Sequence, residues 1–200
     1  MSSRDKAVLV GTASSALDFY QDATSRFFGD DSLLAIDIWA FLAHMPSVAP
    51  KLGPIIQNAR RGLQQSELRF GECDSRTVRY QLRLARLEWE ETRYLNLKPT
   101  VPQSRYEKIL EQATQRVDCN PAFKYIAECN LAWMHNENGS HEAAEGYMQA
   151  ALSTALSEGS HDDIMNHCIT LERWLVDRGE HDKAREVRQA WERLTPPEEG

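Results

Sequence analysis

Apolar residues recur every three or four positions along almost the whole chain. That spacing gathers apolar side chains on one face of a helix, whereas a half-buried strand requires strict alternation of apolar and polar residues. Such alternation is absent over four or more residues, apart from the stretch around residues 8–10. We interpret glycine and proline as marks of the connections between the periodic segments rather than as parts of them. The pattern predicts an all-α protein.

Capping residues and helix breakers divide this pattern into about nine helices. Ser75 and Ser104 are typical N-caps, and Pro121 suits the first turn of a helix, where its missing N–H would have no partner. Because the connections are short, successive helices are expected to be antiparallel. The expected helices cover residues 3–28, 31–44, 54–70, 75–97, 104–117 and 121–138, and three more begin at Ser140, Ser160 and Glu180.

A segment in the C-terminal half of the chain is repeated after forty residues. The stretch from Gly139 to Ala144 recurs from Gly179 to Ala184, and a leucine stands eight residues before each glycine. Glycine adopts the left-handed conformation that ends a helix. The alanine lets the second helix approach the first closely. Each copy therefore predicts a hairpin of two helices joined by a glycine turn.

This arrangement resembles the tetratricopeptide repeat (TPR) family. The motif has a leucine–small pair on its first helix, a glycine in the turn and small residues on its second helix. Residues 121–157 match it best, and residues 161–196 match it except at Glu172 and Trp191, where the family has small residues. The matching positions of the better copy are Leu131, Ala132, Gly139, Ala144, Met148 and Ala151.

The resemblance extends less regularly to residues 78–121, whereas residues 1–74 contain no match. It implies a solenoid of three helical hairpins over residues 75–196, preceded by an N-terminal helical cap or extension over residues 1–74. Proteins of this family bind other proteins or peptides. The resemblance therefore implies a non-catalytic binding module, such as an adaptor, a chaperone or a regulatory domain.

Composition and charge narrow the classes of function further. The chain has 200 residues, of which 42% are hydrophobic and 26% charged, as in ordinary globular proteins. No apolar run approaches the roughly 20 residues of a membrane-spanning helix. The apolar run at residues 7–10 is shorter than a signal-peptide core, so we expect a cytoplasmic protein. The net charge of −7 disfavours non-specific nucleic-acid binding, although residues 51–98 carry ten basic against six acidic side chains.

Neither catalysis nor the binding of a metal or cofactor is indicated. The chain lacks the P-loop, G-x-G-x-x-G, G-x-S-x-G and H-E-x-x-H patterns. His167 and Cys168 are adjacent, but neighbouring residues on a helix point in different directions and do not form a dyad. The cysteines form no C-x-x-C pair, and we interpret them as small buried or half-buried side chains. They are Cys73, Cys119, Cys129 and Cys168.

The feature most typical of a binding surface is a row of arginines in the helix expected over residues 75–97. Their spacing places all of them on one helix face, between two apolar flanks. An inner helix of a solenoid has this geometry, with the charged face lining the concave groove. An ordinary solvated face with intrahelical pairs is the alternative, and Arg60 and Arg61 on the preceding helix would extend the same surface. The arginine face consists of Arg76, Arg79, Arg83, Arg86 and Arg93.

Arginine is the side chain best suited to bidentate binding of carboxylates and phosphates. We therefore expect the arginine face to hold an acidic or C-terminal peptide segment of a protein partner, with Arg79, Arg83 and Arg86 at the centre of the site. A regulatory protein that binds nucleic acid through the same arginines is the alternative.

Overall fold

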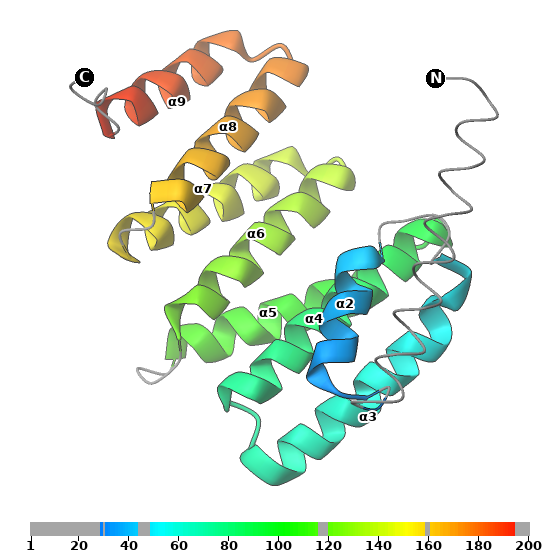
Figure 1. The fold of residues 1–200 in the computed structure, drawn as a ribbon. Coiled ribbons are helices and arrows are strands. Elements are labelled where there is room, and N and C mark those ends of the chain that lie inside the picture. Colours follow the sequence, from blue (N-terminus) through cyan, green and yellow to red (C-terminus); the bar gives the residue numbers. More distant parts are fainter. Residues whose placement is uncertain (1–28, 30, 44–48, 116–119, 159–160, 195–200) are drawn as a thin grey trace, which may run out of the picture. The chain divides into compact units, whose positions relative to one another are not determined.

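The computed structural model describes residues 29, 31–43, 49–115, 120–158 and 161–194. In this part of the chain the backbone forms eight α-helices, one short 3-10 turn and no strand, which confirms the all-α prediction (Figure 1). The helix expected over residues 3–28 lies outside the described residues. The elements are α2 (Leu33–Leu42), the 3-10 turn (Ala49–Lys51), α3 (Leu52–Phe70), α4 (Ser75–Tyr94), α5 (Thr100–Gln115), α6 (Pro121–Glu137), α7 (His141–Glu158), α8 (His161–Asp177) and α9 (His181–Leu194).

Local sequence signals explain most of the helix boundaries, but three predicted details were wrong. The side chain that caps α4 belongs to Asp74 and not to the serine that follows it. The same helix ends at Tyr94, three residues earlier than predicted, because Asn96 takes a left-handed φ of 53°. Helix α5 begins at Thr100, before the expected cap at residue 104. Pro102 lies in its first turn, where a missing N–H leaves no hydrogen bond unmade.

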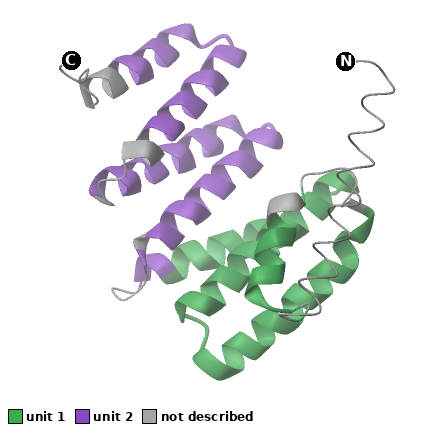
Figure 2. Ribbon diagram, in the orientation of Figure 1, with its two compact units in different colours: residues 1–112 green, residues 113–200 purple. Residues whose placement is uncertain are grey.

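The described helices belong to two compact units, residues 1–112 and residues 113–200 (Figure 2). Within the first unit, α4 packs against both α2 and α3. The division between residues 1–74 and 75–196, which rests on the repeat pattern, stays a prediction. None of the described helices is long and apolar enough to cross a membrane.

Both flanks of α4 are buried, as the sequence pattern predicted. Leu84 and Leu87 on one flank belong to a core that includes residues of α2 and α3. Leu82 on the other flank is also buried. Arg79 and Arg83 lie exposed between the two flanks. The helix is therefore held on two sides and presents its arginine face on the third.

The two copies of the sequence repeat form the same turn in the second unit. In the first copy the N–H of Ser140 donates to the carbonyl of His135 at 2.8 Å, and the N–H of Gly139 donates to the carbonyl of Asn136 at 3.1 Å. The residues forty positions later make the corresponding bonds at 2.8 and 2.9 Å. Gly139 and Gly179 have φ values of 76° and 78°. This bonding pattern is the Schellman motif, and it confirms that both glycines end helices.

The leucines and alanines that the repeat places near these turns are buried in the second unit. Leu131 and Ala144 have no exposed surface, and Leu171 and Ala184 are each 4% exposed. Ala144 and Ala184 belong to one cluster with Trp174 and other residues of α6, α7 and α8. The repeated positions are therefore the ones at which neighbouring helices meet.

Substitutions of Gly139 test directly whether this residue needs the left-handed conformation of the turn. No atom lies within 4 Å of a Cβ added there, so only the backbone conformation opposes a side chain. Valine should lower the free energy of unfolding of the second unit by about 2 kcal/mol, because a β-branched residue resists positive φ. Asparagine should lower it by less than about 1 kcal/mol, because it tolerates the left-handed region. Urea denaturation compares the two variants, and equal stability would contradict the turn.

Candidate functional site

The central arginines of the α4 face already contact carboxylates within the protein. Arg83 Nε lies 2.5 Å from Oδ1 of Asp37 on α2. Arg86 and Arg93 lie 2.8 and 2.9 Å from carboxylate oxygens of Glu90, whose side chain is only 5% exposed. An acidic ligand would have to compete with these ion pairs. Arg83 and Arg86 are therefore already paired with carboxylates of the protein and are not free to bind a ligand.

The arginines expected to extend this face from α3 also have partners within the unit. Arg60 lies 2.9 Å from Oε1 of Glu88, a buried carboxylate of α4. Arg105 of α5 approaches the other oxygen of the same carboxylate at 2.6 Å. Arg61 is exposed and contacts the side-chain oxygen of Asn58. Glu88 thus links α3, α4 and α5.

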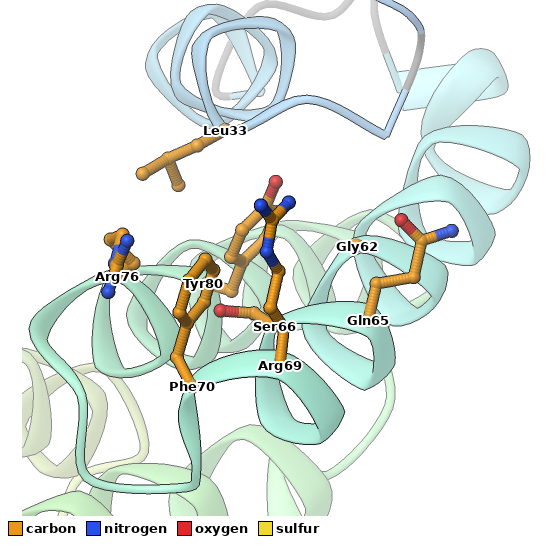
Figure 3. A pocket seen from close by; sticks show the side chains of 8 residues that line it. All are labelled: Leu33, Gly62, Gln65, Ser66, Arg69, Phe70, Arg76 and Tyr80. Carbon is orange, nitrogen blue, oxygen red and sulfur yellow. The ribbon is translucent and has the colours of Figure 1, made fainter.

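The N-terminal end of the arginine face borders a pocket of about 250 Å³ formed by α2, α3 and α4 (Figure 3). Its walls combine apolar, aromatic and cationic side chains, which is a suitable lining for a ligand that has both an apolar part and a negative charge. The lining residues are Leu33, Gly62, Gln65, Ser66, Arg69, Phe70, Arg76 and Tyr80.

Arg76 is held in place by the residue that caps its own helix. Its Nε and Nη2 donate to the two carboxylate oxygens of Asp74 at 2.8 and 2.9 Å. These hydrogen bonds, together with the bond from the backbone N–H of Arg76, lower the pKa of Asp74 to about 2. The guanidinium carbon lies 3.4 Å from the ring centre of Phe70, within the range of a cation–π contact. Arg76 is therefore oriented by two independent contacts.

A second arginine, Arg69, stands on the other side of the same ring. Its guanidinium carbon lies 5.2 Å from the ring centre of Phe70, and Figure 3 shows Phe70 between Arg69 and Arg76. The side chain is exposed. The described residues provide Arg69 with no carboxylate partner, and the same holds for Arg79, one turn beyond Arg76 on α4. Neither guanidinium is therefore neutralised by a carboxylate of the described residues.

The floor of the pocket is fixed by hydrogen bonds between the helices. The hydroxyl of Tyr80 donates to the backbone carbonyl of Asp31 at 2.8 Å. Burial raises the pKa of Tyr80, and the negative charges of Asp31 and Asp37 raise it further, so this hydroxyl remains a donor at neutral pH. Beside it, the buried hydroxyls of Ser66 and Thr77 are 2.8 Å apart. The pocket is therefore rigid at its base.

The sequence identified only one of the arginines in this pocket. Arg76 belongs to the predicted face, whereas Arg69 and Phe70 stand at the end of α3, one turn after residues that periodicity assigns to the core. Gly71, with φ of 85°, ends α3 immediately after them. An arginine–aromatic pair before a turn glycine was the available signal. Its link to Arg76 depends on how the hairpin closes, which the spacing alone does not reveal.

In the described part of the chain, no three His, Cys, Asp or Glu side chains converge on a possible metal site. Three cysteines have the predicted environment, since Cys73 and Cys129 are half-buried and Cys168 is buried. Cys119 lies outside the described residues. One histidine contact was not predicted: His167 of α8 lies against Cys129 of α6 and not against the adjacent cysteine.

The second unit contains a buried carboxylate, Glu128, that makes stability depend on pH. Burial raises its pKa, opposed by a hydrogen bond of 2.9 Å from Thr154 and by the charge of Lys124. The folded protein then binds a proton that the unfolded chain has released. The contribution of Glu128 to the free energy of unfolding is complete below the ordinary pKa of a carboxyl group. It is lost as the pH rises from that pKa through the raised pKa of Glu128 in the folded protein.

Glu128→Gln should therefore be neutral at about pH 4 and stabilising by about 1 kcal/mol at about pH 7. The amide oxygen still accepts the Thr154 hydroxyl, while the buried charge is removed. Urea denaturation of both proteins across this pH range measures the difference. A constant difference at all pH values would contradict the raised pKa.

No family model matches the chain, and no curated protein matches it in sequence. Membership of the TPR family therefore stays a prediction that rests on the repeated residues and their turns.

Proposed function

We propose that the protein is a non-catalytic, cytoplasmic binding module that holds an acidic or C-terminal peptide segment in the pocket formed by α2, α3 and α4. The observation that carries the proposal is the pair Arg69 and Arg76 on opposite sides of Phe70. Arg69 has no carboxylate partner among the described residues, so a carboxylate of the ligand supplies the missing charge. Adaptor, chaperone and regulatory roles are all consistent with such a module.

The position of the pocket changes which part of the arginine face is assigned to the ligand. Arg83 and Arg86 are paired with Asp37 and Glu90, so they stabilise the unit rather than bind the ligand. Arg76 is paired with Asp74, so at the N-terminal end of the face the arginines without a carboxylate partner among the described residues are Arg79 and, from α3, Arg69. Phe70 and Leu33 add apolar surface, which suits the side chain next to a peptide carboxylate.

The charges around the pocket favour a peptide over a nucleic acid. Asp31, Asp37 and Asp74 lie among the basic side chains of this unit. A nucleic acid presents a phosphate at every nucleotide, and some of these phosphates would meet the aspartates. A peptide can place one carboxylate at the pocket and its other acidic residues away from the aspartates, because its charges are not fixed at every residue. The nucleic-acid alternative thus has weaker support.

A separate proposal concerns the fold of the second unit. We infer that α6–α7 and α8–α9 are two related TPR-like hairpins. The support is that both turns make the same backbone hydrogen bonds at corresponding positions, and that the repeated leucines and alanines are buried. These hairpins belong to the second unit, whereas the proposed pocket belongs to the first.

Arg69→Gln should weaken peptide binding about tenfold or more, the value of one lost charge-assisted interaction. The probe is a fluorescein-labelled peptide rich in aspartate and glutamate with a free C-terminal carboxylate, and the readout is fluorescence polarisation. Arg185→Gln is the matched control, because Arg185 is a 67% exposed arginine in the second unit. Equal binding by both variants would reject the pocket.

Two further probes separate the alternatives. An amidated peptide of the same sequence tests whether the terminal carboxylate or the acidic side chains are recognised. A single-stranded oligonucleotide tests nucleic-acid binding, whose affinity should fall linearly with salt on a log–log scale. Binding of the oligonucleotide with such a slope, and no binding of either peptide, would favour the nucleic-acid alternative.

A further inference from the structure

A cysteine, a histidine and a tyrosine form a hydrogen-bonded cluster in the second unit, apart from the proposed pocket. The Sγ of Cys129 lies 2.9 Å from Nε2 of His167. The hydroxyl of Tyr125 lies 3.1 Å from Nδ1 of the same imidazole. Tyr125 and Cys129 stand one turn apart on α6, so one helix face contacts both nitrogens of a side chain on α8.

The imidazole is held firmly in this position. The rings of Tyr125 and His167 have their centres 5.0 Å apart and are tilted by 45°. Tyr125 in turn packs against Ala155 of α7 and Cys168 of α8. A fixed imidazole beside a thiol is the arrangement that activates cysteine in proteins.

The hydrogen-bonding capacity of the cluster suits a charged pair. A protonated imidazole donates from both nitrogens. In a charged pair, one N–H would point to the tyrosine oxygen and the other to the sulfur, which would accept as a thiolate. Glu128 is next to Cys129 in sequence, but its carboxylate accepts a hydrogen bond from Thr154 and forms an ion pair with Lys124.

We propose that Cys129 is a nucleophilic thiol, activated by His167, that hydroperoxides oxidise reversibly to a sulfenic acid. Cys129 and His167 are both half-buried, so neither residue is fully shielded from solvent. Sulfenic acids return to thiols by way of disulfides with other thiols. The site is a modification site and is independent of the peptide pocket.

The reaction balances with the groups of the cluster and a hydroperoxide. The Cys129 thiolate attacks the terminal oxygen of the peroxide, so an S–O bond forms as the O–O bond breaks. The cysteine is oxidised by two electrons, and the peroxide is reduced to an alcohol, or to water when it is hydrogen peroxide. The proton of the imidazolium passes to the leaving oxygen, which leaves His167 neutral.

The other described cysteines provide internal comparisons. Cys168 is buried, and desolvation raises its pKa, so it should react slowly. Cys73 is half-buried like Cys129, but it lies in the first unit, on the connection between α3 and α4. A difference between Cys129 and Cys73 thus compares a thiol beside an imidazole with a thiol of the same burial class in the first unit.

The test is the rate of alkylation of each cysteine by iodoacetamide in the full chain, resolved by peptide mass spectrometry. At about pH 6, where ordinary thiols are almost entirely protonated, Cys129 should react about tenfold faster than Cys73, because the thiolate is the form that attacks and the imidazole promotes it. Hydrogen peroxide followed by dimedone should likewise label Cys129 in preference to Cys73.

His167→Asn should bring the rate at Cys129 to within about twofold of that at Cys73, while His181→Asn, at an exposed histidine of α9, should leave it unchanged. Slow reaction of Cys168 in the His167→Asn protein verifies that α8 stays folded. If Cys168 becomes reactive, Tyr125→Phe replaces that variant, since it keeps the ring and should lower the rate at Cys129. Equal rates at Cys129 and Cys73 in the unmodified protein, or a rate at Cys129 that neither variant lowers, would overturn the proposal.

Discussion

Arg105→Met is expected to lower the free energy of unfolding of the first unit by about 3 kcal/mol. The guanidinium of Arg105 donates to both oxygens of Glu88, at 2.6 and 3.2 Å. The Glu88 side chain is only 4% exposed, so it cannot regain water when a partner is lost. Arg60 alone, at 2.9 Å, then opposes a buried negative charge. Methionine preserves most of the apolar stem of the arginine side chain. The loss of stability therefore measures the effect of removing the charge.

Hydrogen exchange of peptides from α4 measures this effect, with peptides from α7 in the second unit as an internal reference. Because the chain has two compact units, local exchange assigns the loss to one of them. Arg185→Met on α9 is the matched control and should change stability by less than about 0.5 kcal/mol, as for an exposed side chain.

A double substitution distinguishes the buried charge from the packing of the side chain. In Arg105→Met combined with Glu88→Met, the carboxylate is removed along with its partner, and the double variant should be more stable than Arg105→Met alone. If instead the two losses add, the contribution of Arg105 is its packing and not its charge.

The sequence predicted features that depend on neighbouring residues in the chain. The glycine turns at Gly139 and Gly179 were found because a left-handed residue at the end of a helix leaves a local signal. The two buried flanks of α4 were found because periodicity determines which residues share a helix face. Both signals act over one or two helical turns.

The sequence did not predict contacts between residues distant in the chain. The pairing of Arg83 with Asp37 joins residues 46 positions apart, and the contact of His167 with Cys129 joins residues 38 positions apart. Nothing in the spacing of arginines shows which of them meet a carboxylate on another helix. The predicted site was therefore a whole helix face, whereas the structure leaves only its N-terminal end open to a ligand.

The interpretation of glycine as a mark of the connections was also wrong at two positions. Gly62 and Gly146 lie within α3 and α7 rather than in connections. Intrinsic propensity alone opposes both, by about 1 kcal/mol each relative to alanine. A tertiary contact accounts for Gly62, and none of the described residues accounts for Gly146, because a Cβ added there has no atom within 4 Å.

Gly62→Ala is expected to destabilise the first unit by about 2 kcal/mol, against the direction of helix propensity. A Cβ at this position would lie 2.5 Å from the backbone oxygen of Asp31 and 2.5 Å from Cε1 of Tyr80. The oxygen belongs to the backbone and the ring is held by its hydrogen bond to that same oxygen, so neither moves freely. The added methyl group must separate α3 from α2 and α4.

Gly146→Ala makes the same chemical change on an open helix face and should stabilise the second unit by about 0.5–1 kcal/mol. Hydrogen exchange of α3 and α7 peptides in the two variants gives both values in the same protein. Opposite signs would confirm that close contact with Asp31 and Tyr80 requires glycine at position 62. If both substitutions stabilise, propensity outweighs the contact, and the segment before α2 does not pack on α3 as closely as the structure places it.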